Sequence, residues 1–165
     1  MEGYLFSSNR WYIIVIIPKS STAISDEFKF NPKGKKNKKM INSFLIINCT
    51  GKNNSIGLKS DNKFFKEKLQ NNINSNNQLV SNIINFVKKY KVKLSDKYSI
   101  IVNMGPGSYS SIRISLSVAK GIQIVLGSKL YGYKNNQLSE FKLENIEILI
   151  KNKQLKNKMI NPIYE

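Results

Sequence analysis

The 165-residue sequence predicts one α/β domain with a mixed sheet, between Ile41 and Lys134. Short apolar runs typical of buried strands alternate there with two longer segments whose apolar residues follow a helical spacing. Turn-forming Asn, Gly and Ser residues separate several of these runs. The predicted order is three strands, a helix, a strand, a second helix and a final strand.

Five segments are predicted as strands. Residues 43–50, SFLIINCT, form a nearly continuous apolar run that suits a buried strand. Residues 55–60, SIGLKS, follow a turn and are expected to return as its antiparallel neighbour. Residues 62–70 are expected to form a third, more exposed strand, and the runs YSIIVNM and KLYGY are expected to form later strands.

Two segments are predicted as helices. Ser75 or a nearby Asn is the expected cap of the first, whose apolar residues recur at three-and-four spacing: Leu79, Ile83, Phe86, Val87 and Tyr90. The second, residues 111–126, carries apolar side chains almost all round. Such a helix is either buried on several sides, or buries one side and offers the other to a partner.

The two flanking segments differ from the domain between them. Residues 1–40 end in the basic, turn-prone stretch NPKGKKNKK and are expected to be a poorly ordered or mis-annotated extension. The alternative for this segment is an added edge strand from Tyr12 to Ile17. Residues 135–165 are expected to be a short remnant of a second domain, with room after Phe141 for one strand or hairpin and a basic tail.

The composition excludes several classes of site. The sequence has no His and only one Cys, Cys49. A disulfide within the chain, a zinc site of the Cys/His type, and a Ser-His or Cys-His catalytic pair are therefore excluded, and no metal or cofactor is expected. A reducing cytoplasm is the expected setting. The apolar run from Trp11 to Pro18 is much shorter than the roughly 20 residues that a membrane-spanning helix needs, so no membrane contact is expected.

The net charge of +17 leaves two interpretations open. All but two of the 27 basic residues are Lys, and Lys, Asn and Ile are over-used together, as an AT-rich coding sequence alone would produce. The alternative is an RNA-binding module that acts by charge. Only Arg10 and Arg113 could make the planar contacts of specific phosphate or base recognition, and the Lys-rich segments lie in the expected tails.

The corner Gly105–Ser108 connects a predicted strand to the second predicted helix. The glycines permit a tight turn, and Ser108, Ser110 or Ser111 can cap the helix that follows. A phosphate loop is excluded, because Lys120 is followed by Gly121 inside the helix and not by Ser or Thr at its start. A nucleophile elbow is excluded because no serine here sits between suitably spaced glycines.

The stretch GPGSYSSIRISLSVAKGI resembles the signature of the TsaB (YeaZ) family, which reads Gly-Pro-Gly-Ser-Phe/Tyr-Thr-Gly-Leu/Ile-Arg and, a few residues on, Ala-Lys-Gly. The match is ungapped and includes Gly105, Pro106, Gly107, Ser108, Tyr109, Arg113, Lys120 and Gly121. Ser110 and Ser111 replace the family's Thr and Gly. The resemblance implies an actin-like (ASKHA, ribonuclease H-like) half-domain whose second half is largely missing, in a shortened and diverged member of the family.

The resemblance also implies a function. Such a subunit is a non-catalytic scaffold that supports a TsaD-like catalytic subunit and, through it, a TsaE-like ATPase in threonylcarbamoylation of tRNA, which it contacts indirectly. The two helices form the interface with the partner, and a homodimer through the same helices is the alternative. The residues expected in this interface are Leu79, Ile83, Phe86, Val87, Leu116, Ala119, Ile122 and Gln123.

Departures from the family pattern keep other functions open. The family's first strand ends in Ile-Asp-Thr, where this chain has Asn48, Cys49 and Thr50. An amide cannot supply the negative charge that helps to hold a metal and phosphates in actin-like ATPases, so an independent ATPase is disfavoured. The alternatives are a degenerate relic that folds but no longer binds and, less favoured, a nucleotide-dependent transferase or glycopeptidase.

Overall fold

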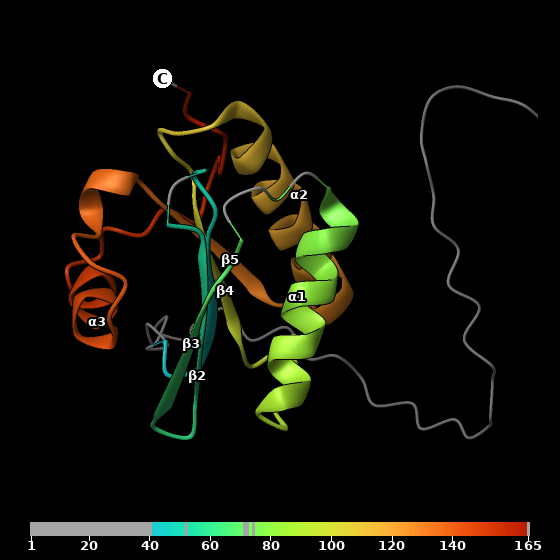
Figure 1. The fold of residues 1–165 in the computed structure, drawn as a ribbon. Helices are drawn as coiled ribbons and strands as arrows, with labels where there is room; N and C mark the ends of the chain where they lie inside the picture. Colours follow the sequence, from blue (N-terminus) through green and yellow to red (C-terminus); the bar gives the residue numbers. More distant parts are fainter. Residues whose placement is uncertain (1–40, 52, 71–72, 74, 165) are drawn as a thin grey trace, which may run out of the picture. The chain divides into compact units, whose positions relative to one another are not determined.

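A five-stranded mixed sheet forms the centre of the domain (Figure 1). The computed structural model describes residues 41–51, 53–70, 73 and 75–164. The expected extension of residues 1–40, with the alternative edge strand in it, lies outside the described residues. The strands stand in the order β3 (Lys63–Lys68), β2 (Ser55–Ser60), β1 (Phe44–Asn48), β4 (Ser99–Asn103), β5 (Lys129–Tyr133).

The pairing of the strands confirms the predicted mixed sheet. β1 pairs antiparallel with β2 and parallel with β4, and β5 adds to β4 in parallel. Among the described strands, β3 pairs only with β2, and it is the more exposed strand that was expected. Because β1, β4 and β5 run in the same direction, their carboxyl ends meet at one end of the sheet.

The two predicted helices cover one face of the sheet (Figure 1). Helix α1 (Asn76–Lys89) begins at Ser75, whose side-chain oxygen accepts a hydrogen bond from the Gln78 amide at 3.2 Å, so the expected cap is confirmed. Helix α2 (Tyr109–Leu126) begins two residues earlier than predicted and ends at Gly127, which has the left-handed backbone typical of a helix C-terminus. No helix in the described part of the chain is both long and apolar enough to cross a membrane.

Helix α3 (Leu143–Lys151) covers the opposite face, so the strand or hairpin expected after Phe141 is wrong. A short 3-10 helix, η1 (Asn135–Gln137), precedes it. β1 is apolar on both faces of the sheet. Its Leu45 and Ile47 side chains point to the face covered by α1 and α2, while Phe44 and Ile46 point to the opposite face. An apolar face must be covered, and α3 covers this one with two buried side chains, Ile146 and Leu149.

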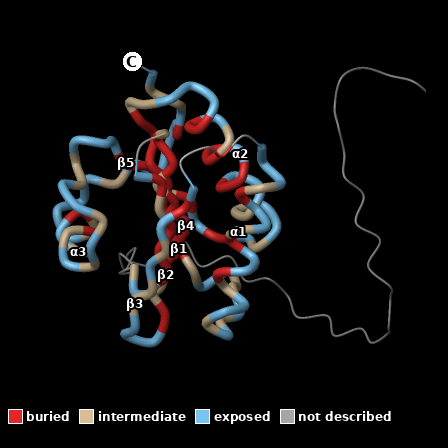
Figure 2. The backbone as a smooth tube through the Cα atoms, viewed as in Figure 1, coloured by how far each residue is buried: buried red, intermediate tan, exposed pale blue. Residues whose placement is uncertain are grey.

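Residues 135–164 lie in the same compact unit as residues 41–134. The Nζ atom of Lys59 on β2 forms an ion pair with Glu147 on α3 at 2.6 Å. Beyond α3 the chain returns to β5, where Gly132 and Lys156 exchange two backbone hydrogen bonds. Figure 2 shows the buried residues concentrated in the sheet and on the helix faces that meet it.

Candidate functional site

The signature corner joins β4 to α2 and is packed from two sides. Gly105 has φ of 106°, and a Cβ atom there would lie 2.2 Å from the Ile163 carbonyl oxygen. The Ile163 amide donates to the Met104 carbonyl at 2.7 Å, so the C-terminal segment is held against the corner. The Gly105 amide in turn donates to Oδ1 of Asn103 at 2.9 Å. Only glycine fits this position without displacing the C-terminal segment.

The second half of the corner packs against the turn that follows β1. A Cβ atom on Gly107 would lie 2.5 Å from the Thr50 carbonyl oxygen, which also accepts a hydrogen bond from the Ser108 amide at 2.9 Å. A Cβ atom on Gly51, whose φ is 97°, would lie 2.8 Å from Cβ of Ser108. These contacts make the corner a junction between two turns. Glycine is required at these positions because the two turns approach each other too closely for a side chain.

Ser108 occupies the N-cap position of α2, but its side chain accepts no capping hydrogen bond from the described residues. Ser110 and Ser111 lie inside the first turn of the helix. The helix therefore begins without the side-chain cap that was expected from Ser108, Ser110 or Ser111. The corner is fixed by the backbone contact of Ser108 with Thr50 instead.

The other signature residues lie along α2 and do not converge on one site. The Arg113 guanidinium donates a hydrogen bond to the Tyr109 hydroxyl and lies 4.9 Å from the centroid of its ring. The Tyr109 ring also packs on Tyr164, with centroids 4.7 Å apart, which adds a further contact with the C-terminal segment. Lys120 and Gly121 lie further along the helix and are exposed. A Cβ atom on Gly121 would have no described neighbour within 4 Å.

The structure divides the residues expected in the partner interface into two groups. Val87, Ile122 and Gln123 are partly exposed. The other five are buried in the domain's own core and do not reach the surface: Leu79, Ile83, Phe86, Leu116 and Ala119. The apolar spacing identified the helix face that packs inward, and it gave no sign of which apolar residues remain outside.

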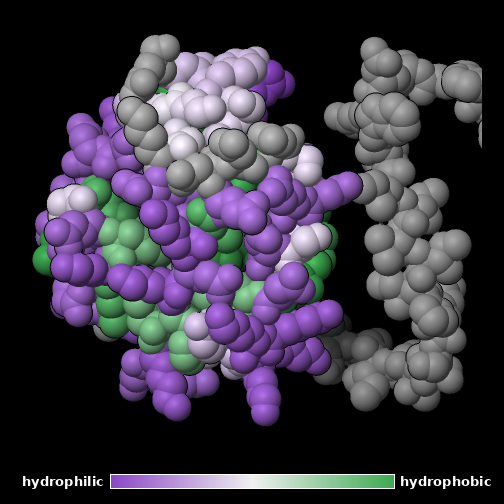
Figure 3. Space-filling view, viewed as in Figure 1, coloured by the Kyte–Doolittle hydropathy of each residue, from purple (hydrophilic) through white to green (hydrophobic). Residues whose placement is uncertain are grey.

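The exposed apolar side chains of the two helices are different ones. Ile124 and Val125, near the end of α2, are 79% and 82% exposed. Val80 and Ile84 on α1 are also exposed. Figure 3 shows hydrophobic surface among hydrophilic surface on the α1 side of the molecule, and a wider hydrophobic area between β3 and α3. For Ile124 and Val125, the signal in the sequence was that apolar residues lie almost all round the second predicted helix.

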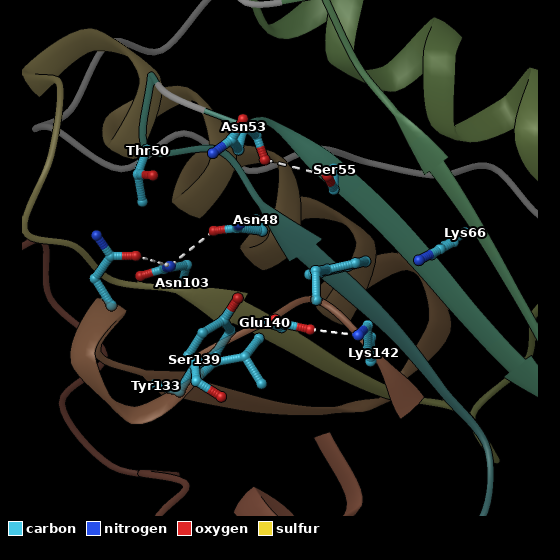
Figure 4. Close-up of a pocket in the computed structure, with 13 residues that line it drawn as sticks. Asn48, Thr50, Asn53, Ser55, Lys66, Asn103, Tyr133, Ser139, Glu140 and Lys142 are labelled. Atoms are coloured by element: carbon cyan, nitrogen blue, oxygen red, sulfur yellow. Dashed lines mark hydrogen bonds and ion pairs between the residues drawn. The ribbon is translucent and has the colours of Figure 1, made fainter. Parts of the chain in front are cut away.

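A cavity of about 490 Å³ opens at the carboxyl ends of the parallel strands, beside the loop of residues 138–142 that leads to α3. Three asparagines that follow or end these strands form a hydrogen-bonded row (Figure 4). Nδ2 of Asn103 donates to Oδ1 of Asn48 at 2.7 Å and to Oδ1 of Asn135 at 3.2 Å. Oδ1 of Asn103 accepts from the corner, as described above, so the row is oriented by Gly105.

The chemistry of this end of the sheet is that of amides and hydroxyls. Among the described residues, no group of three or more Asp, Glu, Cys or His side chains could hold a metal ion. Burial raises the pKa of the Cys49 thiol to about 12, which keeps it protonated and a poor nucleophile at neutral pH. Sequence reasoning identified Asn48 as a departure from a family pattern and missed Asn103, Asn135 and Tyr133 as its neighbours.

Solved structures with a similar fold are known. The described fold matches "YeaZ from Pseudomonas aeruginosa" with a TM-score of 0.53 and 17% identity, over 58% of this chain and 45% of that chain. It matches equally a Pseudomonas aeruginosa protein described as uncharacterized with similarity to the peptidase YeaZ, with a TM-score of 0.53 and 17% identity, over 58% of this chain and 44% of the other. The chain therefore spans less than half the length of either protein.

Sequence comparisons add no closer relative. No protein-family model matches the chain, and no curated protein matches it. At 17% identity the structural likeness shows the fold alone, which is a YeaZ-like α/β fold. It confirms the YeaZ-like fold implied by the signature, which begins at the corner between β4 and α2 and continues along α2.

Proposed function

We propose that this protein is a TsaB-like, non-catalytic scaffold subunit that binds a TsaD-like catalytic subunit in the threonylcarbamoylation of tRNA. The observation that carries the proposal is the coincidence of a YeaZ-like fold with the signature corner at the start of α2. A TsaE-like ATPase joins through the TsaD-like subunit, and tRNA contacts the protein indirectly. The reaction takes place in the cytoplasm.

The chemistry of the described residues supports a scaffold better than an enzyme. The sequence has no His to activate a serine of the corner. Its one thiol, Cys49, is buried and has a raised pKa. The glycines of the corner are explained by close packing against Thr50 and Ile163, without any need for a reacting substrate.

The outer faces of α1 and α2 offer the surface for the partner. Each helix presents an exposed apolar residue one turn away from an exposed Lys: Ile84 precedes Lys88 on α1, and Ile124 follows Lys120 on α2. Apolar anchors supply most of the binding energy of an interface, while charges at its rim steer association. The partner surface that fits is therefore apolar at its centre and acidic at its edge.

A matched pair of variants tests this surface. In the double variant Ile124→Glu, Val125→Glu, both changes fall on exposed positions, so the domain stays folded. The control is Ile148→Glu on α3, which makes the same change at a 53% exposed position on the opposite face of the sheet. We expect the double variant to bind a TsaD-like protein from the same organism at least about 30-fold more weakly, and the control to bind as the unaltered chain does.

The outcomes of this experiment separate the candidate roles. Equal binding by both variants places the interface elsewhere and overturns the assignment to α1 and α2. Loss of self-association in the double variant, with binding of the partner unchanged, assigns the face to a homodimer. Sedimentation of each variant alone distinguishes these cases.

A further inference from the structure

The proposed scaffold role does not explain one buried polar group in the cavity at the carboxyl ends of β1, β4 and β5. The Tyr133 side chain is completely buried and lines the cavity, and its hydroxyl has no hydrogen-bond partner among the described residues. Figure 4 shows the ring rising from β5 with its hydroxyl directed toward Asn48 and Asn103. Buried hydroxyls are normally paired, so an unpaired one at the floor of a cavity points to a missing partner.

The environment of this hydroxyl is uncharged. Burial raises the pKa of the Tyr133 phenol. The Asn103 side chain lies close enough to the hydroxyl to lower this pKa by a smaller amount, but not in the geometry of a hydrogen bond, so the group is a neutral donor and acceptor at ordinary pH. The Asn48 amino group also donates no hydrogen bond within the described part of the chain. Within the described part of the chain, the floor therefore offers one unpaired amide donor beside one unpaired hydroxyl.

The walls of the cavity define the rest of the ligand. Leu138 and Phe141, in the loop before α3, supply an apolar side against which a planar group can lie. The carboxylate that lines the cavity, Glu140, forms an ion pair with Lys142 at 2.6 Å (Figure 4). Lys66 lines the same rim. No described acidic cluster is present to hold a metal-bound phosphate.

We propose that this cavity binds a small uncharged molecule through a planar amide edge, in which an N–H donor stands beside a carbonyl acceptor. Asn side chains pair with such an edge through two parallel hydrogen bonds, as they do with nucleobases. In this site the ligand's carbonyl accepts from the Asn48 amino group, and its N–H donates to the Tyr133 hydroxyl. A nucleobase and a simple carboxamide share this chemistry. The site lies apart from the exposed faces of α1 and α2 and does not depend on the scaffold role.

Titration of the ¹⁵N-labelled full chain with uridine and with nicotinamide tests the proposal. We expect saturable shifts of the side-chain amide resonances of Asn48, Asn103 and Asn135 with at least one probe. Tyr133→Phe removes only the hydroxyl, and Asn48→Asp replaces the amide donor by a charge. Each should weaken binding about tenfold, the effect of losing one or two hydrogen bonds. The control Asn85→Asp, at an exposed position on α1, should leave the affinity unchanged.

Each outcome decides for or against the site. Binding of both probes shows that the amide edge is sufficient, and binding of uridine alone identifies a nucleobase as the ligand. No saturable shift with either probe, in a chain whose spectrum shows that it is folded, means that water completes the site, and overturns the proposal. It is also overturned if Tyr133→Phe and Asn48→Asp both bind as the unaltered chain does, or if Mg²⁺ with ATP binds more tightly than uridine.

Discussion

Replacing Gly105 by Ala should destabilise the protein through two separable effects. The backbone at Gly105 has φ of 106°, where a residue with a Cβ atom costs about 1–3 kcal/mol. The new Cβ would also lie 2.2 Å from the Ile163 carbonyl oxygen, so the C-terminal segment must move. This movement loses the hydrogen bond from Ile163 to Met104, about 1 kcal/mol, and part of the burial of Ile160. The free energy of unfolding should fall by about 2–5 kcal/mol in all.

The same substitution at Gly121 is the matched control. Gly121 lies within α2, where a Cβ atom meets no described neighbour within 4 Å. Ala is favoured over Gly inside a helix by about 0.5–1 kcal/mol, so Gly121→Ala should raise the free energy of unfolding. Urea unfolding followed by circular dichroism measures both variants, and an unchanged m-value shows that the same transition is compared.

Removing residues 158–165 separates the two effects at Gly105. In the shortened chain no Ile163 carbonyl is present, so Gly105→Ala should cost only the backbone term of about 1–3 kcal/mol. The reasoning is refuted if Gly105→Ala is as stable as Gly121→Ala. It is also refuted if the cost at Gly105 is the same with and without the C-terminal segment, because the contact with Ile163 would then contribute nothing.

Two further predictions concern the corner, and a third concerns the buried side chains of Cys49 and Tyr133. Gly107→Val should lower the free energy of unfolding by about 1–3 kcal/mol, because a Cβ there meets the Thr50 carbonyl at 2.5 Å; an unchanged midpoint in urea would contradict this contact. Ser108→Ala should change stability by less than about 0.5 kcal/mol, since the side chain makes no capping bond within the described chain, and a loss of 1 kcal/mol or more would show that it does. Alkaline pH should destabilise the fold, because burial raises the pKa of Cys49 from 9.0 to about 12 and also raises that of Tyr133. Both groups stay protonated in the folded protein, while the unfolded chain loses their protons. Their contribution to the free energy of unfolding is therefore intact below about pH 9 and is lost as the pH rises toward 12. Each group lowers the free energy of unfolding by up to about 1.4 kcal/mol per pH unit. Denaturant unfolding between pH 8 and 11 should show a shallower decline in Cys49→Ala and in Tyr133→Phe, and identical slopes in all three proteins would contradict the assignment.

The central sheet and α1 could be predicted because their signals are local. β1 and β4 are short apolar runs, and α1 combines a capping Ser75 with apolar residues at helical spacing. The short segment that forms α3 was ambiguous because nine residues with a few aliphatic side chains suit either a strand or a helix. The choice depends on the uncovered face of the sheet that Phe44 and Ile46 create, a property of the assembled sheet and not of the segment.

The candidate sites were harder to predict, for the same reason. Apolar residues occur on both sides of α2, and only the packed structure shows that Leu116 is inside and Ile124 outside. Asn48, Asn103 and Asn135 are far apart in the sequence and meet only because β1, β4 and β5 are parallel neighbours. An Asn at or just after the carboxyl end of each parallel strand was the available signal.

Direct binding of the full chain to a TsaD-like protein from the same organism tests the central claim. Isothermal titration calorimetry, with light scattering of the mixture after size-exclusion chromatography, measures affinity and stoichiometry together. The proposed scaffold role predicts saturable binding with a single stoichiometry and a Kd of about 1 μM or tighter, the range of a specific interface of standard size. If the chain unfolds cooperatively and is therefore folded, yet neither heat nor a complex is detected at 100 μM of each protein, it is a folded relic and not a scaffold.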